Sequence, residues 1–380
     1  MGAEQLTLQE PWGDVPRPLT KIKTGPKKHP FTVYSRALDT TVAGQRYAGS
    51  IGSIVILKGG TMFANIVIFL VLVVITLGLG YLTYRAIRAR KVWVKIVGGL
   101  PAALLTLVFA AVTVTAGIGL SKIYGAVNPP IPANLKVDGT PAQLARGQYI
   151  VNVSCAGCHA SVPEDRKSPL TGGADFANEI PIPIGSLIVS NIASDGQIKD
   201  YTDAQLFRAI RHGVRRDGLP LTFMPLLAIR EYSDDDVKSV IAYLRAQPPA
   251  QSNKQGGDQV NFVAVLLFGA GMFPGWTPAQ ETVAAIPQGA TPAYGKYVAT
   301  LGDCRACHGP NMTGTPDSNL GPGAPNPRPF VATLTVDQFR QTLKTGKRPN
   351  GTELKMPWQN AAQMTDDDLA ALYAYLKAQP

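Results

Sequence analysis

The sequence predicts an all-α protein in which a two-helix transmembrane hairpin precedes two small helical domains that repeat each other. Three observations support this fold class. Two uncharged apolar runs lie close together near the N-terminus, a Cys-x-x-Cys-His pattern occurs twice, and the residues around the two patterns match. The expected order is a basic tail over 1–61, a hairpin over 62–120, a first domain over 140–250, a linker over 251–288 and a second domain over 289–380.

Composition and charge exclude several classes of protein. Charged residues make up 16% of the 380 residues, against about 25% in an average soluble domain. Four cysteines are too few for a disulfide scaffold. The net charge of +10 falls entirely in residues 1–125, beside the apolar runs and not on a folded basic domain. The chain is therefore not expected to bind nucleic acid.

Residues 62–82 and 96–120 carry no charged side chain, and each run exceeds the ~20 residues that a helix needs to cross a bilayer. Two buried helices of a soluble protein are the less favoured alternative. The link over 83–95 is basic and has no acid, and short basic loops stay in the cytoplasm. We therefore expect a multi-pass protein of the bacterial plasma membrane, in contact with lipid, whose tail and C-terminal part both lie on the periplasmic side.

The first 30 residues contain no apolar core typical of a cleavable signal peptide, so the first span is expected to direct insertion. The Pro, Gly, Lys and Thr residues of the tail over 1–61 follow no clear period. The tail is either flexible or an extended arm that becomes ordered on a partner complex.

All four cysteines belong to the motifs Cys155-Ala-Gly-Cys158-His159 and Cys304-Arg-Ala-Cys307-His308. This pattern is typical of covalent haem c attachment, because two thiols on one helical turn can bond one porphyrin while the next histidine ligates its iron. A four-cysteine zinc site would leave both histidines unexplained, and a thioredoxin-like motif would need a preceding strand. Since haem c is attached outside the bacterial plasma membrane, both motifs are expected there.

The two motif regions repeat each other. Gly147-Gln-Tyr149 and Gly295-Lys-Tyr297 precede the motifs, Met224-Pro and Met356-Pro follow them, and each copy ends in a helix with a Ser or Thr and three acids at its start. Such starts cap a helix and suit its dipole. Each copy is therefore expected to be a small helical bundle whose core the porphyrin completes.

The sixth iron ligand follows from counting methionines. Met224 is the one methionine between the first motif and residue 250, whereas the second copy offers Met312, Met356 and Met364. Met312 is too close to His308, and Met364 begins the last helix, so Met356 is predicted from its shared Met-Pro context. The alternative is that these methionines only pack in a core. The predicted axial pairs are His159 with Met224 and His308 with Met356, and such ligation raises the reduction potential.

From about residue 140 to 380 the chain resembles a membrane-anchored dihaem cytochrome c with two class I cytochrome c domains. Ser190-Asn-Ile, the Phe207–Gly213 stretch, Met-Pro and the acid-capped Tyr-Leu helix are similar to those of the cytochrome c subunits of membrane alcohol dehydrogenases. The resemblance implies two covalently attached haem c groups. It implies thioether bonds at Cys155, Cys158, Cys304 and Cys307, and iron ligation by the four predicted axial residues.

Class I domains often orient the iron-bound histidine with a proline carbonyl, for which Pro163 and Pro310 are the candidates. Arg208 and Arg211 are expected on a helix surface, with a contact to the haem propionates as the alternative. His212 is expected to be a surface or propionate-side residue. The apolar run over 260–276 is too short to span a membrane, so it is expected to pack between the haem domains, against a partner or against the membrane surface.

The predicted function is the relay of single electrons without catalysis. The chain has two haem motifs where the dehydrogenase subunits usually have three, and it adds the hairpin, which favours a subunit of a respiratory or photosynthetic complex. Its redox partner would be a soluble cytochrome c or cupredoxin, an oxidase or a reaction centre. The alternatives are the cytochrome subunit of a periplasmic dehydrogenase and a dihaem enzyme such as a peroxidase, which both Met-Pro motifs disfavour.

Overall fold

The structure is a computed structural model that describes residues 60–252, 256–317 and 323–378. These described residues belong to one compact unit. The predicted tail over 1–61 lies, apart from its last two residues, outside the described residues.

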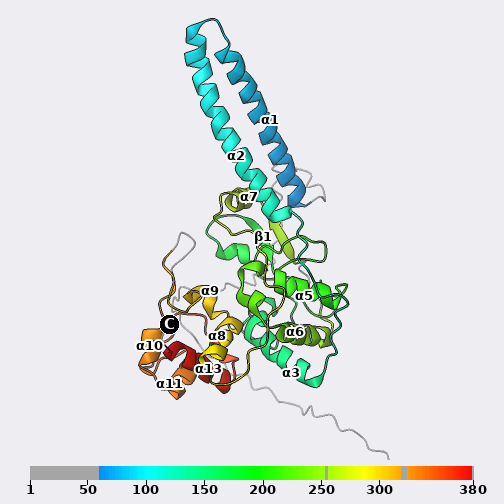
Figure 1. Cartoon of the computed structure of the whole chain (residues 1–380), viewed down its shortest axis with the longest axis vertical. Helices are drawn as coiled ribbons and strands as arrows, with labels where there is room; N and C mark the ends of the chain where they lie inside the picture. Colours follow the sequence, from blue (N-terminus) through cyan, green and yellow to red (C-terminus); the bar gives the residue numbers. More distant parts are fainter. Residues whose placement is uncertain (1–59, 253–255, 318–322, 379–380) are drawn as a thin grey trace, which may run out of the picture. The chain divides into compact units, whose positions relative to one another are not determined.

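The described chain is mainly helical (Figure 1). Its elements in chain order are α1 (Thr61–Ile87), η1 (Val94–Gly99), α2 (Leu100–Tyr124), α3 (Pro141–Ile150), η2 (Val151–Cys155), α4 (Ala156–His159), η3 (Phe176–Glu179), β1 (Gly185–Ile188), α5 (Asp203–His212), η4 (Met224–Leu226), η5 (Ala228–Glu231), α6 (Asp234–Ala246), β2 (Gly257–Val260), α7 (Phe262–Gly269), α8 (Pro292–Leu301), α9 (Cys304–His308), α10 (Arg328–Ala332), α11 (Val336–Thr345), α12 (Gln359–Ala362) and α13 (Asp366–Lys377).

Helices α1 and α2 form the predicted apolar hairpin and lie side by side (Figure 1). The helical runs Thr61–Ile87 and Val94–Tyr124 have a mean hydropathy of 2.8 and 2.2, and both are long and apolar enough to cross a membrane. Each is longer than the uncharged run that predicted it. Threonine hydroxyls join the two helices, with Thr76 Oγ1 2.9 Å from Thr113 Oγ1 and Thr83 Oγ1 3.0 Å from Thr106 Oγ1.

The open end of the hairpin is tied to the rest of the chain by a buried asparagine. Asn65 Nδ2 donates hydrogen bonds to Tyr124 Oη and to the Val260 carbonyl, both at 2.9 Å. The start of α1, the end of α2 and the end of β2 therefore meet at one place, at the opposite end of the hairpin from its basic turn.

Helix α7 is the apolar segment of the predicted linker, and it packs against α2. The two backbones come so close that a Cβ on Gly119 would lie 1.9 Å from the Val265 carbonyl, and one on Gly269 would lie 1.9 Å from the Thr115 carbonyl. Only glycine fits both positions. The segment contacts the hairpin, which was not among the packing partners expected from the sequence.

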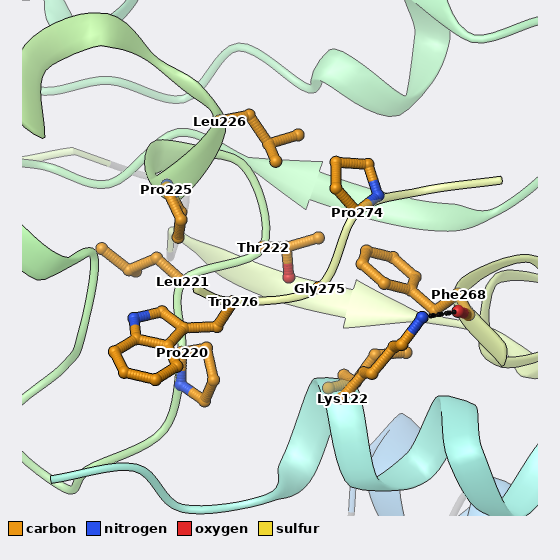
Figure 2. Close-up of a pocket in the computed structure, with 11 residues that line it drawn as sticks. Lys122, Pro220, Leu221, Thr222, Pro225, Leu226, Phe268, Pro274, Gly275 and Trp276 are labelled. Atoms are coloured by element: carbon orange, nitrogen blue, oxygen red, sulfur yellow. Dashed lines mark hydrogen bonds between the residues drawn. The ribbon is translucent and has the colours of Figure 1, made fainter. Parts of the chain in front are cut away.

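A small pocket lies where α2 meets the loops around α7 and η4 (Figure 2). Lys122 reaches across it, and its Nζ donates a 2.8 Å hydrogen bond to the Phe268 carbonyl. Pro225 and Trp276 are among its other lining residues. Its volume of about 10 Å³ leaves room for about one water molecule, so it is a packing gap in this junction.

Strands β1 and β2 pair in an antiparallel two-stranded sheet, with Gly185 opposite Val260. The prediction of a purely helical chain is wrong at this point. The short strands were missed because neither has alternating apolar residues, and the pairing joins residues that are far apart in the sequence.

Two similar helical regions follow the hairpin: the first CxxCH segment (residues 140–250) and the second CxxCH segment (residues 289–380). In the first, α3 packs against α6, and in the second, α8 packs against α13. The predicted caps are confirmed, because Ser233 and Thr365 accept hydrogen bonds from the backbone N–H of Asp236 and Asp368. Apolar residues of both segments, including Ile150, Ile241, Val298 and Leu372, belong to one buried cluster.

Candidate haem-binding sites

The first motif lies at the end of a continuous helical stretch. Thr140 begins α3 with a capping box, in which its side chain accepts from the Gln143 N–H. The stretch continues through the π-helical turn η2 into α4, which ends at His159. Cys155 and Cys158, three residues apart on this stretch, are therefore neighbours on one helical face.

A cavity of about 270 Å³ opens beside this motif, and Cys155, Cys158, His159 and Met224 all line it. The structure therefore brings together the four residues predicted for the first haem. Most of the remaining lining is apolar and comes from residues 176–244 of the first CxxCH segment: Phe176, Leu187, Ile192, Ile198, Leu206, Ile210, Leu221, Phe223, Leu227, Ile229, Val240 and Leu244.

The imidazole of His159 is held by one of its two nitrogens. Nδ1 lies 2.9 Å from the Ser190 carbonyl oxygen. Because a carbonyl only accepts, Nδ1 carries the ring proton and donates a hydrogen bond to it. The other nitrogen, Nε2, is left with a free lone pair, which is the form that ligates a metal. Burial lowers the pKa of His159, which favours the neutral ring.

The two thiols of this motif are protonated at neutral pH, since burial raises the pKa of Cys155 to about 12 and also raises that of Cys158. Neither cysteine forms a disulfide. Among the described residues, no group of three or more His, Cys, Asp and Glu side chains could hold a metal ion. The four-cysteine zinc site weighed from the sequence therefore lacks the geometry that it needs.

The second motif forms α9 and repeats the histidine arrangement. His308 Nδ1 lies 2.8 Å from the Pro325 carbonyl, which again leaves Nε2 free. Cys304 is half-buried and Cys307 is exposed. Burial raises the pKa of Cys304 to about 12 and also raises that of Cys307.

The three methionines of the second segment have different surroundings. Met312 and Met364 are buried, with 3% and 1% of their surface exposed. The Met364 methyl group lies against Gly302, where an added Cβ would be 2.2 Å from Met364 Cε. Met356 is half-buried in the loop between α11 and α12 and packs at the edge of the core. Met312 and Met364 therefore serve as core residues, and Met356 stays the candidate ligand.

The expectation that Pro163 and Pro310 orient the histidines is wrong. The accepting carbonyls belong to Ser190 and Pro325, which lie 31 and 17 residues beyond their histidines. The Pro310 carbonyl instead accepts from Arg305 Nε at 2.9 Å. A loop that returns to the motif supplies each carbonyl, which local spacing could not reveal.

The surface positions predicted for Arg208, Arg211 and His212 are also wrong, because all three are buried, with exposed fractions of 7%, 0% and 2%. Arg208 donates to the Arg215 carbonyl at 2.7 Å, and Arg211 donates to Asp234 at 2.6 Å. None of the three lines the haem cavity. Arg208 and Arg211 join α5 to the loops around it through these hydrogen bonds.

Sequence reasoning missed the polar residues of the cavity, among them Gln197, Tyr201 and Arg215. Arg215 pairs with Asp217 through an Nη2–Oδ2 contact of 2.5 Å. The signal was weak, since Arg215 follows the glycine that ends α5 and resembles any charged turn residue. Arg215 supplies the cationic side chain in the lining of this cavity.

The residues present fit a covalently attached haem. One apolar cavity carries two thiols, an imidazole nitrogen with a free lone pair, a thioether and an arginine. These are the groups needed to bond two vinyl carbons, ligate iron on two sides and pair with a carboxylate.

Comparison with known proteins agrees with this chemistry. The sequence model of the family described as "Cytochrome C oxidase, cbb3-type, subunit III" matches residues 142–244 and 290–376, once for each motif. The gluconate 2-dehydrogenase cytochrome c subunit of Pantoea cypripedii is 28% identical over 273 residues, which cover 62% of this chain and 59% of that protein. The quinone-dependent alcohol dehydrogenase cytochrome c subunit of Komagataeibacter europaeus is 28% identical over 284 residues, covering 64% and 57%.

A protein named "Diheme cytochrome c-type" from Cereibacter sphaeroides is 28% identical over 300 residues, which cover 70% of this chain and 98% of that protein. The chain spans less than three fifths of the length of the two dehydrogenase subunits. The relatives are named as cytochromes or cytochrome subunits, which agrees with the predicted electron-transfer role. The chain therefore belongs to the family of c-type cytochromes described as cbb3-type cytochrome c oxidase subunit III.

Proposed function

We propose that this chain is a membrane-anchored dihaem cytochrome c that relays single electrons on the periplasmic face of the plasma membrane. The observation that carries the proposal is the cavity that brings Cys155, Cys158, His159 and Met224 together. The matching motif, carbonyl-bound His308 and Met-Pro loop of the second segment support a second haem. We propose class I cytochrome c domains over 140–250 and 289–380, joined by the linker over 251–288.

Each group of residues has a separate task at such a site. Bound haem supplies a one-electron Fe(III)/Fe(II) couple. The cysteines would hold the porphyrin covalently. The carbonyls of Ser190 and Pro325 bind Nδ1 of the two imidazoles, so that Nε2 of each ring is free and would ligate the iron. The apolar lining of the first cavity would exclude water from a bound haem. His308 and Met356 are proposed as the axial pair of the second site.

The sidedness of the proposal rests on the hairpin. Its turn carries Arg88, Arg90 and Lys91, which favours the cytoplasm. The start of α1 and the end of α2 meet at the other end, through the Asn65–Tyr124 hydrogen bond. Everything after Tyr124 would then begin on the periplasmic side, where haem c is attached.

We propose that the electron donor is a dehydrogenase subunit of a membrane complex, because several relatives are named as dehydrogenase cytochrome subunits. From the sequence alone, a role as the cytochrome subunit of a dehydrogenase was the alternative to a respiratory or photosynthetic complex. The names of these relatives support the dehydrogenase over a photosynthetic complex. A soluble cytochrome c, a cupredoxin or a terminal oxidase would accept the electron.

The test uses membranes that contain the tagged full-length chain. The chain is purified with its partners, and the haem absorbance is followed after adding alcohols, sugars or sugar acids in turn. Reduction of the haem by one of these substrates, with a dehydrogenase subunit in the preparation, is the expected result. Reduction by a quinol alone, with no dehydrogenase present, would contradict the proposed donor and place the chain after a quinol-oxidising enzyme.

A further inference from the structure

A buried hydrogen-bonded bridge joins the two CxxCH segments beside their motifs. Tyr232 has 1% of its surface exposed. Its hydroxyl oxygen lies 2.8 Å from Ser154 Oγ and 3.2 Å from the Leu301 carbonyl oxygen. A carbonyl can only accept, so both contacts are satisfied when Tyr232 donates to Leu301 and accepts from the Ser154 hydroxyl.

The two ends of the bridge lie next to the predicted haem attachment points. Ser154 directly precedes Cys155, and both Ser154 and Tyr232 line the first haem cavity. On the other side, Leu301 ends α8 just before the second motif. The chain turns back there, so Cys304 Sγ lies 3.8 Å from the Gly302 carbonyl oxygen. The bridge therefore leads from one motif to the other through bonded and hydrogen-bonded atoms.

Reciprocal tyrosine–aspartate contacts hold the two segments in register around this bridge. Tyr149 of the first segment donates to Asp368 of the second, and Tyr297 of the second donates to Asp236 of the first at 2.6 Å. Tyr149 and Tyr297 occupy matching positions of the repeat, as do the two aspartates. Arg146 adds two bonds of 2.7 and 2.8 Å to Asp236. These contacts hold the two segments together independently of the Tyr232 hydroxyl.

A further ion pair ties the second motif itself to the first segment. Arg305, inside the second Cys-x-x-Cys-His pattern, pairs with Glu231, the residue before Tyr232. Arg305 Nη1 also donates to Thr300 Oγ1 at 2.8 Å. Both neighbours of the bridge, Glu231 and Thr300, are therefore joined to the same guanidinium group.

We propose that Tyr232, with Ser154, is a positioning residue that carries the electronic contact between the two haem sites. The inference rests on the proposed function, since it needs a haem at each motif. One electron leaves the reduced site and reduces the oxidised site, and no proton moves. Burial raises the pKa of Tyr232 well above its ordinary value, so the hydroxyl keeps its proton throughout. Without the hydroxyl, the hydrogen-bonded connection from Ser154 to the Leu301 carbonyl is lost, and transfer between the sites slows.

The experiment measures the rate at which the two haems share an electron in the haem-loaded full-length chain. A flash-photoreduced flavin delivers less than one electron per molecule, and transient absorption follows its redistribution. Tyr232→Phe removes the hydroxyl and keeps the ring. Tyr297→Phe is the matched control, because it removes a buried tyrosine hydroxyl and its contacts between segments at a position that does not line the cavity. These contacts are 2.6 Å to Asp236 and 2.8 Å to the Ser233 N–H. Ser154→Ala removes the other half of the bridge and serves if Tyr232→Phe does not fold.

Redistribution is expected to slow several-fold in Tyr232→Phe and in Ser154→Ala, with both reduction potentials unchanged, and to keep the wild-type rate in Tyr297→Phe. Equal rates in all variants would overturn the inference. Equal slowing in Tyr297→Phe would also overturn it, since the effect would then belong to the interface as a whole. If the wild-type protein contains fewer than two haems, the proposed function fails first, and the haem content of the same sample shows which failure has occurred.

Discussion

The crossing of α3 and α6 gives a prediction whose magnitude follows from the structure. A Cβ on Gly147 would lie 1.9 Å from the Ser239 carbonyl oxygen, 2.6 Å from its carbonyl carbon and 2.8 Å from Tyr243 Cβ. Two of these atoms belong to the backbone of the facing helix, so no side-chain rotation can relieve the contact. Gly147→Ala must therefore push α3 and α6 apart.

Overpacking of a core lowers the free energy of unfolding by about 1–3 kcal/mol. Because the added methyl group of Gly147→Ala would meet backbone atoms, which cannot move aside, we take the upper value of about 3 kcal/mol. Alanine recovers about 1 kcal/mol, because it favours the helix over glycine. The free energy of unfolding is therefore expected to fall by about 2 kcal/mol, a large part of the ~5–15 kcal/mol of a typical domain.

Denaturant unfolding of the haem-loaded protein, followed by haem circular dichroism, measures this loss. Gly78→Ala is the control, because a Cβ there meets nothing within 4 Å. Gly295→Ala should repeat the effect in the second segment, since its added Cβ would lie 1.9 Å from the Ala371 carbonyl oxygen. Unchanged stability of Gly147→Ala would refute the reasoning about this crossing.

Three further predictions concern the haem ligands and one buried histidine. Met224→Ala should allow one haem iron to bind carbon monoxide and should lower its reduction potential, because a thioether ligand raises that potential. A carbon monoxide difference spectrum and a redox titration measure these two effects. Met356→Ala should make the other haem bind carbon monoxide and lower its reduction potential. Met364→Leu should give the same carbon monoxide difference spectrum as the wild type. Carbon monoxide binding in Met364→Leu but not in Met356→Ala would make Met364 the ligand instead. Burial, together with Arg211 and Arg230, lowers the pKa of His212 to about 4. The unfolded chain, with an ordinary histidine pKa of about 6.5, then binds more protons between about pH 4 and 6.5, so stability should fall as the pH decreases through this window. In His212→Gln the denaturant midpoint should depend less steeply on pH between about pH 4 and 6.5. The same pH dependence as in the wild type would show that His212 does not cause this loss of stability.

Features that depend on local sequence were predictable. The hairpin followed from two uncharged runs, and α1 and α2 confirm them. The starts of α6 and α13 followed from a Ser or Thr before three acids, and both caps are present. The first motif and Met224 line one cavity, and their role as haem-binding residues stays a prediction.

Features that depend on distant contacts were not predictable from one sequence. The carbonyls that fix the two histidines come from loops that return to the motif, at Ser190 and Pro325. Burial of Arg208 and Arg211 depends on backbone carbonyls and an aspartate that surround them in the fold. Charged residues at the end of a helix are mostly exposed, so the sequence pattern favoured the wrong answer there.

The most direct test of the central claim is the carbon monoxide response of the reduced full-length protein, measured on a sample of known haem content. We predict two covalently bound haems per chain, both with positive reduction potentials and both unchanged by carbon monoxide, because a histidine and a methionine are proposed to ligate each iron. One haem per chain, or a wild-type haem that binds carbon monoxide, would contradict a relay built from two closed sites.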